Sequence, residues 1–364
     1  MGIGWVGQVA IAIWACAVTV ACGNAVNTNE PASACVGGSA GNDDSTTGRA
    51  GDSMVVAAAG AIGVTAGSTM PTANGVPRCA GVKAVALANA AKGTSYAIAL
   101  DEDAVYFSGP GGMISRVSKS GGNVLALQRG DSAGQLAVDA TNVYVGGYAL
   151  WSVPKLGGEA SLVVDSTVVG LVSVNSWLYF TDWGVLRTGL QRWSSEGGFE
   201  QIERFGSELN ASFLLADSDY IYVTAMATSP ALELHRVRVS DGTTEPLTTA
   251  EVVRGIALAG DYLYLSEEAT HSVKRVRLSD RVTEPVLSFN DYPTGLAADA
   301  EFVYLSLQVL PTGEHDYQGH LLRFRGDGSE LCELAAPANY GQSLVVDATG
   351  IYWIGDGTLW KIAR

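Results

Sequence analysis

From residue 96 to its end, the chain repeats one pattern of apolar and polar positions seven times. Each unit has an apolar run that usually ends in Asp or Asn, a few further residues, and then an aliphatic residue, a tyrosine and a second apolar run. The anchor tyrosines are 38, 35, 43, 42, 40 and 48 residues apart by subtraction of their numbers, which are Tyr106, Tyr144, Tyr179, Tyr222, Tyr264, Tyr304 and Tyr352. This is the period of a four-stranded blade, so the pattern predicts an all-β fold, a seven-bladed β-propeller.

A third strand and a tight turn complete each unit. The third strand carries a basic residue, as in Arg116, Arg236, Lys274 and Arg323. Gly-Gly or Asp-Gly pairs follow, and they supply the positive φ that a tight antiparallel turn requires. A fourth strand then leads into the next repeat, so we expect four antiparallel strands in each blade.

The two ends of the repeat region predict how the ring closes. The last repeat stops after its third strand, at residues 359–362, and therefore lacks an outer strand. The segment from Gly81 to Ala88 precedes the first repeat and can supply that strand, which removes an exposed sheet edge. A six-bladed or open ring is the alternative, because weak repeats are easily miscounted.

Composition agrees with many short strands. The chain has 47% hydrophobic residues, 44 glycines and only 16% charged residues, which suits strands joined by tight turns. Its 22 Lys and Arg stand against 37 Asp and Glu, giving a net charge of −15. Binding to nucleic acid or to an anionic membrane surface requires a basic surface, so we expect neither.

The N-terminus has the pattern of an export signal. Residues 9–21 form an uncharged apolar run of thirteen, too short to span a bilayer comfortably. The run ends at Ala21-Cys22-Gly23, which resembles the bacterial lipobox, and the resemblance implies cleavage before Cys22 and its acylation. Cleavage by the ordinary signal peptidase and an uncleaved anchor are the alternatives.

These observations divide the chain into three parts. We expect residues 1–22 to be a signal peptide of lipoprotein type, residues 23–77 a low-complexity flexible linker, and residues 78–364 the propeller. We expect an exported protein, either secreted or anchored as a lipoprotein at the outer membrane or cell surface. Contact with the membrane is expected only through the N-terminal segment.

Two repeats resemble a known propeller family. Residues 178–182, Leu-Tyr-Phe-Thr-Asp, and residues 351–356, Ile-Tyr-Trp-Ile-Gly-Asp, resemble the Tyr-Trp-Thr-Asp (YWTD) repeat of lipoprotein receptors. The region from 82 to 364 is similar to bacterial secreted propellers related to that repeat and to NHL repeats. The resemblance implies a propeller and extracellular protein binding. The receptors have six blades, whereas the repeats here number seven.

The recurring aspartates have a structural explanation. They are Asp101, Asp139, Asp217, Asp299 and Asp347. Each lies just before the turn from the first strand to the second, where an Asx-turn satisfies backbone N–H groups, so we prefer this role to metal binding. The repeated tyrosines are expected to pack between blades with the hydroxyl bound to a neighbour.

Catalytic and redox motifs are missing from the sequence. It has no G-x-S-x-G elbow, its only histidines are His235, His271, His315 and His320, and no C-x-x-C pair occurs. Without Cys16 and Cys22, three cysteines remain for an oxidising compartment. We prefer the disulfide Cys79–Cys332, and Cys35 with Cys79 is the alternative.

Loop lengths predict the binding face. The second-to-third and fourth-to-first connections vary in length, and in a propeller they share one face. Acids, imidazoles and aromatics gather there on the fifth and sixth repeats, as candidates for binding a cation or a polar ligand. The candidate residues are Glu267, Glu268, His271, Asp291, Tyr292, Glu314, His315, Asp316, Tyr317 and His320. The competing interpretation is a solvated acidic loop.

Two functions fit these observations. We favour a non-enzymatic, monomeric module that presents its variable face to a protein or a glycan at the cell envelope. The rival is a metal-dependent propeller enzyme of lactonase or lyase type with a divalent cation on the axis, and Asn175 breaks the uniform ring of aspartates as such a site could require. No cofactor is predicted for the first function, and Ca²⁺ or Zn²⁺ is the candidate for the second.

Overall fold

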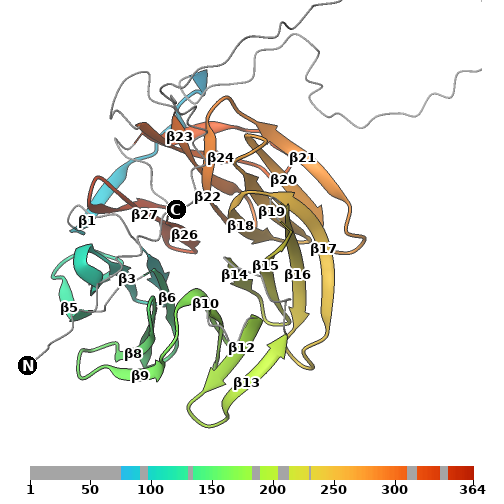
Figure 1. Ribbon diagram of the computed structural model, residues 1–364. Coiled ribbons are helices and arrows are strands. Elements are labelled where there is room, and N and C mark those ends of the chain that lie inside the picture. Colours follow the sequence, from blue (N-terminus) through green and yellow to red (C-terminus); the bar gives the residue numbers. More distant parts are fainter. Residues whose placement is uncertain are drawn as a thin grey trace, which may run out of the picture. The chain divides into compact units, whose positions relative to one another are not determined.

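A computed structural model of the chain describes residues 75–90, 97–129, 134–182, 189–203, 213–228, 231–309, 318–336 and 343–364. The described strands form seven separate sheets, each of four antiparallel strands (Figure 1). The first strands of successive blades contact one another around the ring, in the order β2, β6, β10, β14, β18, β22, β26 and again β2. The predicted seven-bladed propeller is therefore confirmed, and the six-bladed or open ring is wrong.

The first four blades follow the repeats in chain order. Blade 1 is β2 (Ile98–Leu100), β3 (Ala104–Ser108), β4 (Met113–Ser118) and β5 (Leu125–Arg129), with a 3-10 turn, η2 (Pro110–Gly112), before β4. Blade 2 is β6 (Gln135–Val138), β7 (Asn142–Gly146), β8 (Leu150–Pro154) and β9 (Ser161–Val164). Blade 3 is β10 (Val168–Val174), β11 (Trp177–Asp182), β12 (Gly189–Ser194) and β13 (Gly198–Glu203). Blade 4 is β14 (Leu214–Ala216), β15 (Tyr220–Thr228), β16 (Ala231–Arg238) and β17 (Thr244–Glu251).

The last three blades include the one that both ends of the domain build. Blade 5 is β18 (Val253–Ala259), β19 (Tyr262–Glu267), β20 (Ser272–Arg277) and β21 (Thr283–Ser288). Blade 6 is β22 (Tyr292–Ala298), β23 (Val303–Val309), β24 (Gln318–Phe324) and β25 (Cys332–Ala335). Blade 7 is β26 (Leu344–Asp347), β27 (Gly350–Gly355), β28 (Thr358–Ala363) and, as its outer strand, β1 (Ala84–Asn89).

Ring closure follows the sequence prediction with shifted strand ends. β1 pairs antiparallel with β28, from Ala84 opposite Ile362 to Asn89 opposite Thr358. The strand was expected over Gly81–Ala88, but Gly81 has φ +72 and belongs to the preceding turn. Backbone conformation at this glycine therefore delays the start of the strand by three residues.

The segment before β1 also binds the neighbouring blade. A disulfide joins Cys79 to Cys332 at the start of β25, with 5.1 Å between their Cα atoms, which is the pairing preferred from sequence. Arg78 pairs with Glu333 in a parallel bridge, and Val76 is buried among the side chains between blades 5 and 6. The ordered contacts thus begin before residue 78. Cys22, Cys35 and residues 1–74 lie outside the described residues.

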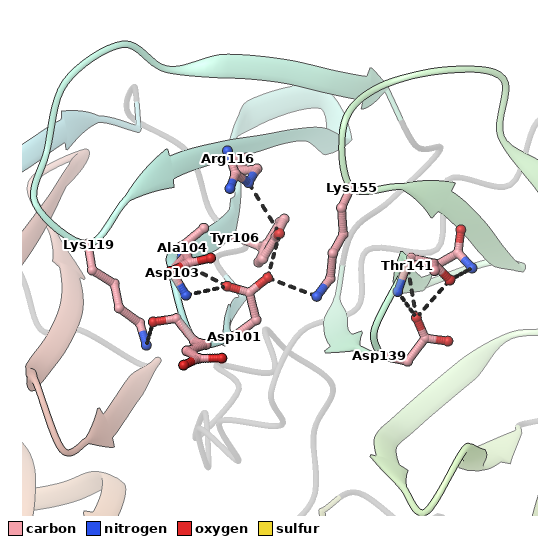
Figure 2. A network of polar contacts seen from close by, with 11 residues as sticks. Asp101, Asp103, Ala104, Tyr106, Arg116, Lys119, Asp139, Thr141 and Lys155 are labelled. Carbon is pink, nitrogen blue, oxygen red and sulfur yellow. Dashed lines mark hydrogen bonds and ion pairs between the residues drawn. The ribbon is translucent and has the colours of Figure 1, made fainter.

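The repeated Asp and Tyr form one unit in four blades. In blade 1, Oδ1 of Asp101 accepts the N–H groups of Asp103 and Ala104, and its Oδ2 accepts the hydroxyl of Tyr106 at 2.8 Å (Figure 2). The same three contacts recur at Asp139, Asp217 and Asp299, each with the tyrosine five residues later. Asp347 caps its turn in the same way, with Thr349 between it and Tyr352. The Asx-turn interpretation is confirmed.

Charged contacts tie adjacent blades together. Lys155, which follows β8 in blade 2, donates to Asp101 of blade 1 at 2.8 Å, as Figure 2 shows. Lys119 of blade 1 pairs with Asp347 of blade 7, and Arg364 of blade 7 pairs with Asp299 of blade 6. The cation of one blade therefore neutralises the aspartate of the blade before it.

The basic residue of the third strand has a related role. In blades 3, 4 and 5 its guanidinium lies over an aromatic ring of its own blade and donates to a backbone carbonyl of the next blade. These arginines are Arg192, Arg236 and Arg275. Their recurrence in the sequence thus reflects contacts between blades.

Candidate functional site

The antiparallel order of the strands gives the ring two faces. Turns from first to second strand and from third to fourth strand lie at one end of every blade, which we call the lower face. The second-to-third and fourth-to-first connections lie at the other end, the upper face. Of the predicted site residues, the structure describes Glu267, Glu268, His271, Asp291, Tyr292 and His320, whereas Glu314, His315, Asp316 and Tyr317 lie outside the described residues.

The turn between β19 and β20 holds the two glutamates. Glu267 is the last residue of β19 and is only 1% exposed, so it is not a solvated loop residue. Its carboxylate pairs with Lys274 of β20 and accepts the hydroxyl of Thr270 at 2.8 Å. Glu268 pairs with Arg254 of β18. Each glutamate of this turn is therefore already neutralised by a cation from its own blade.

His271 connects this turn to the segment between blades 5 and 6. Its φ is +48, and its backbone N–H donates to the carbonyl of Glu268 while its carbonyl accepts the N–H of Phe289. Nδ1 lies 3.2 Å from the carbonyl oxygen of Asn290, and the imidazole centroid is 4.5 Å from that of Tyr292. His271 and Tyr292, two of the predicted site residues, are thus in direct contact.

The proton of the imidazole follows from its partner. Because a carbonyl oxygen only accepts, Nδ1 must carry the hydrogen in the neutral ring, and Nε2 is then the acceptor. His271 and Tyr292 are both half-buried, and Asp291 between the two blades is buried. The junction of blades 5 and 6 therefore presents an oriented imidazole and a phenol on the upper face.

His320 belongs to a different place in the fold. It was predicted to lie with His315 in a long loop, but it is a residue of β24, opposite Leu307 of β23, and is 5% exposed. Its Nδ1 bonds to Glu333 of β25, and Glu333 also pairs with Arg78. The imidazole thus contributes to the contacts that hold the N-terminal segment on blade 6 rather than to a loop surface.

Sequence reasoning missed the partners of the acidic residues. Lys274 and Arg254 neutralise the glutamates, and Asn290 orients His271. A signal existed for Lys274, because the hairpin from Tyr262 to Arg277 places it on the strand that faces the end of β19. Nothing in the repeat pattern identified the other two.

Metal coordination has no candidate in the part of the chain that the structure describes. Within those residues, no three His, Cys, Asp or Glu side chains converge as a metal ion would require. Ca²⁺ or Zn²⁺ on the propeller axis stays a prediction. Among the same residues, no helix is long and apolar enough to cross a membrane.

Comparison with known proteins identifies the fold alone. No protein-family model and no curated protein matches the chain. Among solved structures, virginiamycin B lyase from Staphylococcus aureus is similar, with a TM-score of 0.60 and 15% identity over 78% of this chain and 99% of that chain. A streptogramin B lyase has a TM-score of 0.60 at 14% identity over 77% and 97% of the two chains, and the WD40 repeats of RRP9 have a TM-score of 0.56 at 13% over 79% and 98%.

These similar structures include enzymes and a WD40 repeat domain, so the fold does not select between the two functions considered. The likeness to YWTD and NHL repeats stays a prediction.

Proposed function

We propose that this protein is an exported, lipid-anchored binding module whose upper face, at the junction of blades 5 and 6, contacts a protein or a glycan at the cell envelope. The observation that carries the proposal is the contact between His271 and Tyr292, held in place by the carbonyl of Asn290. A ligand there would meet an aromatic ring and a hydrogen-bond acceptor whose positions are fixed before binding.

The charges around this pair support a polar, uncharged contact surface. Glu267 and Glu268 have Lys274 and Arg254 as partners, so a ligand would not have to compensate unpaired carboxylates. Hydroxyl groups of Thr270 and Ser272 bond to each other at 2.7 Å beside them. Peptide groups and sugar hydroxyls are the ligand groups that such donors and acceptors bind.

Export is supported by two features at opposite ends of the N-terminal region. The apolar run of residues 9–21 followed by Cys22 has the pattern of a signal with a lipidation site. The disulfide between Cys79 and Cys332 is of the kind that persists in oxidising compartments. Globomycin treatment, or the substitution Cys22→Ser, should leave an unprocessed or soluble form. Unchanged processing and membrane retention would exclude acylation.

Binding is tested by recovering partners from envelope extract with the full-length chain. We expect His271→Ala and Tyr292→Ala to lose the recovered partner. Because both side chains are half-buried, each substitution should lower the free energy of unfolding by no more than about 1 kcal/mol. Tyr148→Ala is the control, because Tyr148 is a 48% exposed tyrosine on the upper face of blade 2. Retention of the partner by both site variants would reject the site.

The second candidate is an enzyme. Nε2 of His271 is the acceptor in the neutral ring, and the ring packs against that of Tyr292 with their centroids 4.5 Å apart; an imidazole and a phenol are both groups that can transfer a proton. The lyase activity of similar propellers belongs to those proteins, and a metal-dependent reaction here would require a bound cation. Stoichiometric Ca²⁺ or Zn²⁺ in the purified protein, measured by elemental analysis, would favour the enzyme over the binding module.

A further inference from the structure

Large exposed hydrophobic side chains are concentrated in one arc of the ring. Nine occur among the described residues, and only Val282 belongs to blades 4–6; the others are Val85, Met113, Val124, Leu125, Tyr148, Leu156, Leu162 and Phe199. The highest exposure is that of Leu156, 82%, in the turn between β8 and β9, and Leu162 within β9 is 50% exposed. Leu156 and Leu162 both adjoin the outer strand of blade 2, so the edge of this blade is the surface to consider.

The outer strands of the opposite arc are protected against pairing with other chains. β17 and β21 contain Pro246 and Pro285, each directly after a glutamate, and proline and charge both oppose strand addition at an edge. The outer strand of blade 6 is covered by the segment around Arg78. In contrast, β9 reads Ser-Leu-Val-Val, with no proline and no charged residue.

The molecule itself shows how such an edge is filled. At blade 6, the N–H of Cys79 donates to the carbonyl of Glu333, and the N–H of Glu333 donates to the carbonyl of Pro77. An extended segment thus adds to an outer strand through its backbone. β9 has the length of β25 and the same register shift against the third strand of its blade, so Leu162 occupies the position of Glu333 and directs its N–H and C=O away from β8.

Backbone chemistry also decides which partner suits β9. Inserted into lipid, the outward N–H and C=O of Leu162 would cost several kcal/mol for each group, whereas an added strand pairs them. Trp151, opposite Leu162 in the adjacent strand, packs against the core between blades 1 and 2, so Leu162 itself supplies the apolar contact area at this edge. The net charge of −15 opposes a second copy of the chain and favours a partner with basic residues.

We propose that β9 is a docking edge to which another protein adds an extended segment with apolar residues at alternate positions and flanking Lys or Arg. The added strand extends blade 2 by one strand, and Leu156 and Leu162 contact its apolar side chains. This surface is separate from the upper-face site on blades 5 and 6, so one propeller holds two partners at once.

The test uses the full-length chain and a labelled synthetic peptide of alternating valine and threonine flanked by two lysines at each end. Fluorescence anisotropy should show saturable binding, and a peptide with proline in place of the central valine should bind at least about tenfold more weakly, because it cannot complete the ladder. Amide hydrogen exchange should be slowed in residues 161–164 when the first peptide is bound.

Substitution on the protein side provides the matched comparison. Leu162→Lys places a charge on the edge and should weaken peptide binding about tenfold, whereas Val282→Lys, at a position 45% exposed on blade 5, should leave it unchanged. Val282→Lys should melt like the parent, whereas Leu162→Lys, whose half-exposed side chain faces Trp151, should lose less than about 1 kcal/mol of stability and stay folded in the binding assay. Equal binding by all three proteins would overturn the proposal.

Two further outcomes would also overturn it. Co-sedimentation with phosphatidylcholine vesicles that is lost in Leu162→Lys would assign the surface to a membrane. A dimer in sedimentation velocity that Leu162→Lys dissociates would assign it to a second copy of the chain.

Discussion

Blades 2 and 5 share the order of strands and the tyrosine of the second strand, yet they hold their outer strands by different chemistry. In blade 5, Arg275 and Arg277 of β20 both pair with Glu284 of β21, and Arg275 also lies over the ring of Tyr262. In blade 2, Trp151 of β8 faces Leu162 of β9, and neither strand contains a charged residue.

The difference teaches that the repeat specifies the inner half of a blade more strictly than the outer half. Tyr144 and Tyr264 are both buried, and each donates its hydroxyl, to Asp139 in blade 2 and to the carbonyl of Gly326 in blade 5. Between the third and fourth strands, either an ion-pair network or an apolar cross-strand pair holds the outer strand in place. The choice decides which edges stay open to other chains.

The largest effect on stability is expected from removing β1, the strand that closes blade 7. Deletion of Ala84–Asn89 removes the whole ladder to β28 and exposes the edge of blade 7. We expect a loss of roughly 3 kcal/mol or more, with aggregation, in thermal unfolding followed by circular dichroism. Val85→Ser is the control, because this side chain is 51% exposed and should change stability by less than about 0.5 kcal/mol. A deletion variant that melts like the parent would show that β1 does not close the ring.

A smaller effect is expected from breaking the charged network of blade 5. Arg275→Met removes the pair with Glu284, the stacking on Tyr262 and the 2.8 Å hydrogen bond to the carbonyl of Gly326. We expect a loss of about 2 kcal/mol in denaturant unfolding.

The effect of salt on stability should differ between blade 5, with its ion pairs, and blade 2, with its apolar pair. In 1 M NaCl the loss caused by Arg275→Met should shrink, whereas the loss caused by Trp151→Ala in blade 2 should not, because it has no ionic component. If both losses respond equally to salt, the contrast between the blades is not electrostatic.

The smallest effect on stability is expected from the carboxyl group of Asp101, and it should depend on pH below about 4. Burial alone would raise the pKa of Asp101, but its hydrogen bonds with Lys155, Tyr106 and two backbone N–H groups outweigh burial and lower the pKa to about 2. A carboxyl with a lowered pKa contributes stability that is complete above its ordinary pKa, near 4, and disappears as the pH falls through about 2.

At pH 6 the free energy of unfolding of Asp101→Asn should therefore be about 1 kcal/mol lower than that of the parent. This difference should disappear as the pH falls toward 2. Blade 5 has Ala259 at the equivalent position, so as the pH falls the protection factors for hydrogen exchange should decrease in β2 and β3 before they do so in β18 and β19. A gap that is independent of pH would assign the effect of the substitution to packing.

The propeller was predictable because its inner strands repeat. Turn chemistry and packing require Asp before the first turn and Tyr in the second strand, so both recur in the sequence at the spacing of a blade. The start of β1 was not predictable, because Gly81 is compatible with both a strand and a turn and only its φ of +72 decides.

The candidate site was predictable only in part. His271 and Tyr292 were grouped on one face because the repeats place them on adjacent blades, but the contact between their rings is seen only in the structure. The burial of Glu267 was not predicted, because an acidic residue at the end of a strand is usually solvated, and the ion pair with Lys274 across the hairpin is what allows this one to be buried. His320 was misplaced because the insertion in the sixth repeat hides where β24 begins.

The order of contacts along the N-terminal segment has a mechanical consequence. Chain coming from the N-terminal side reaches Cys79 before Ala84, so a pull on that side loads the covalent bridge to Cys332 before it loads the hydrogen bonds of β1. Strands are easily peeled when force opens their hydrogen bonds one at a time, and the bridge prevents this by passing the load directly to β25 of blade 6. In a propeller held by its N-terminus, the closing strand β1 is thus shielded from the pull, because the load enters the ring at β25.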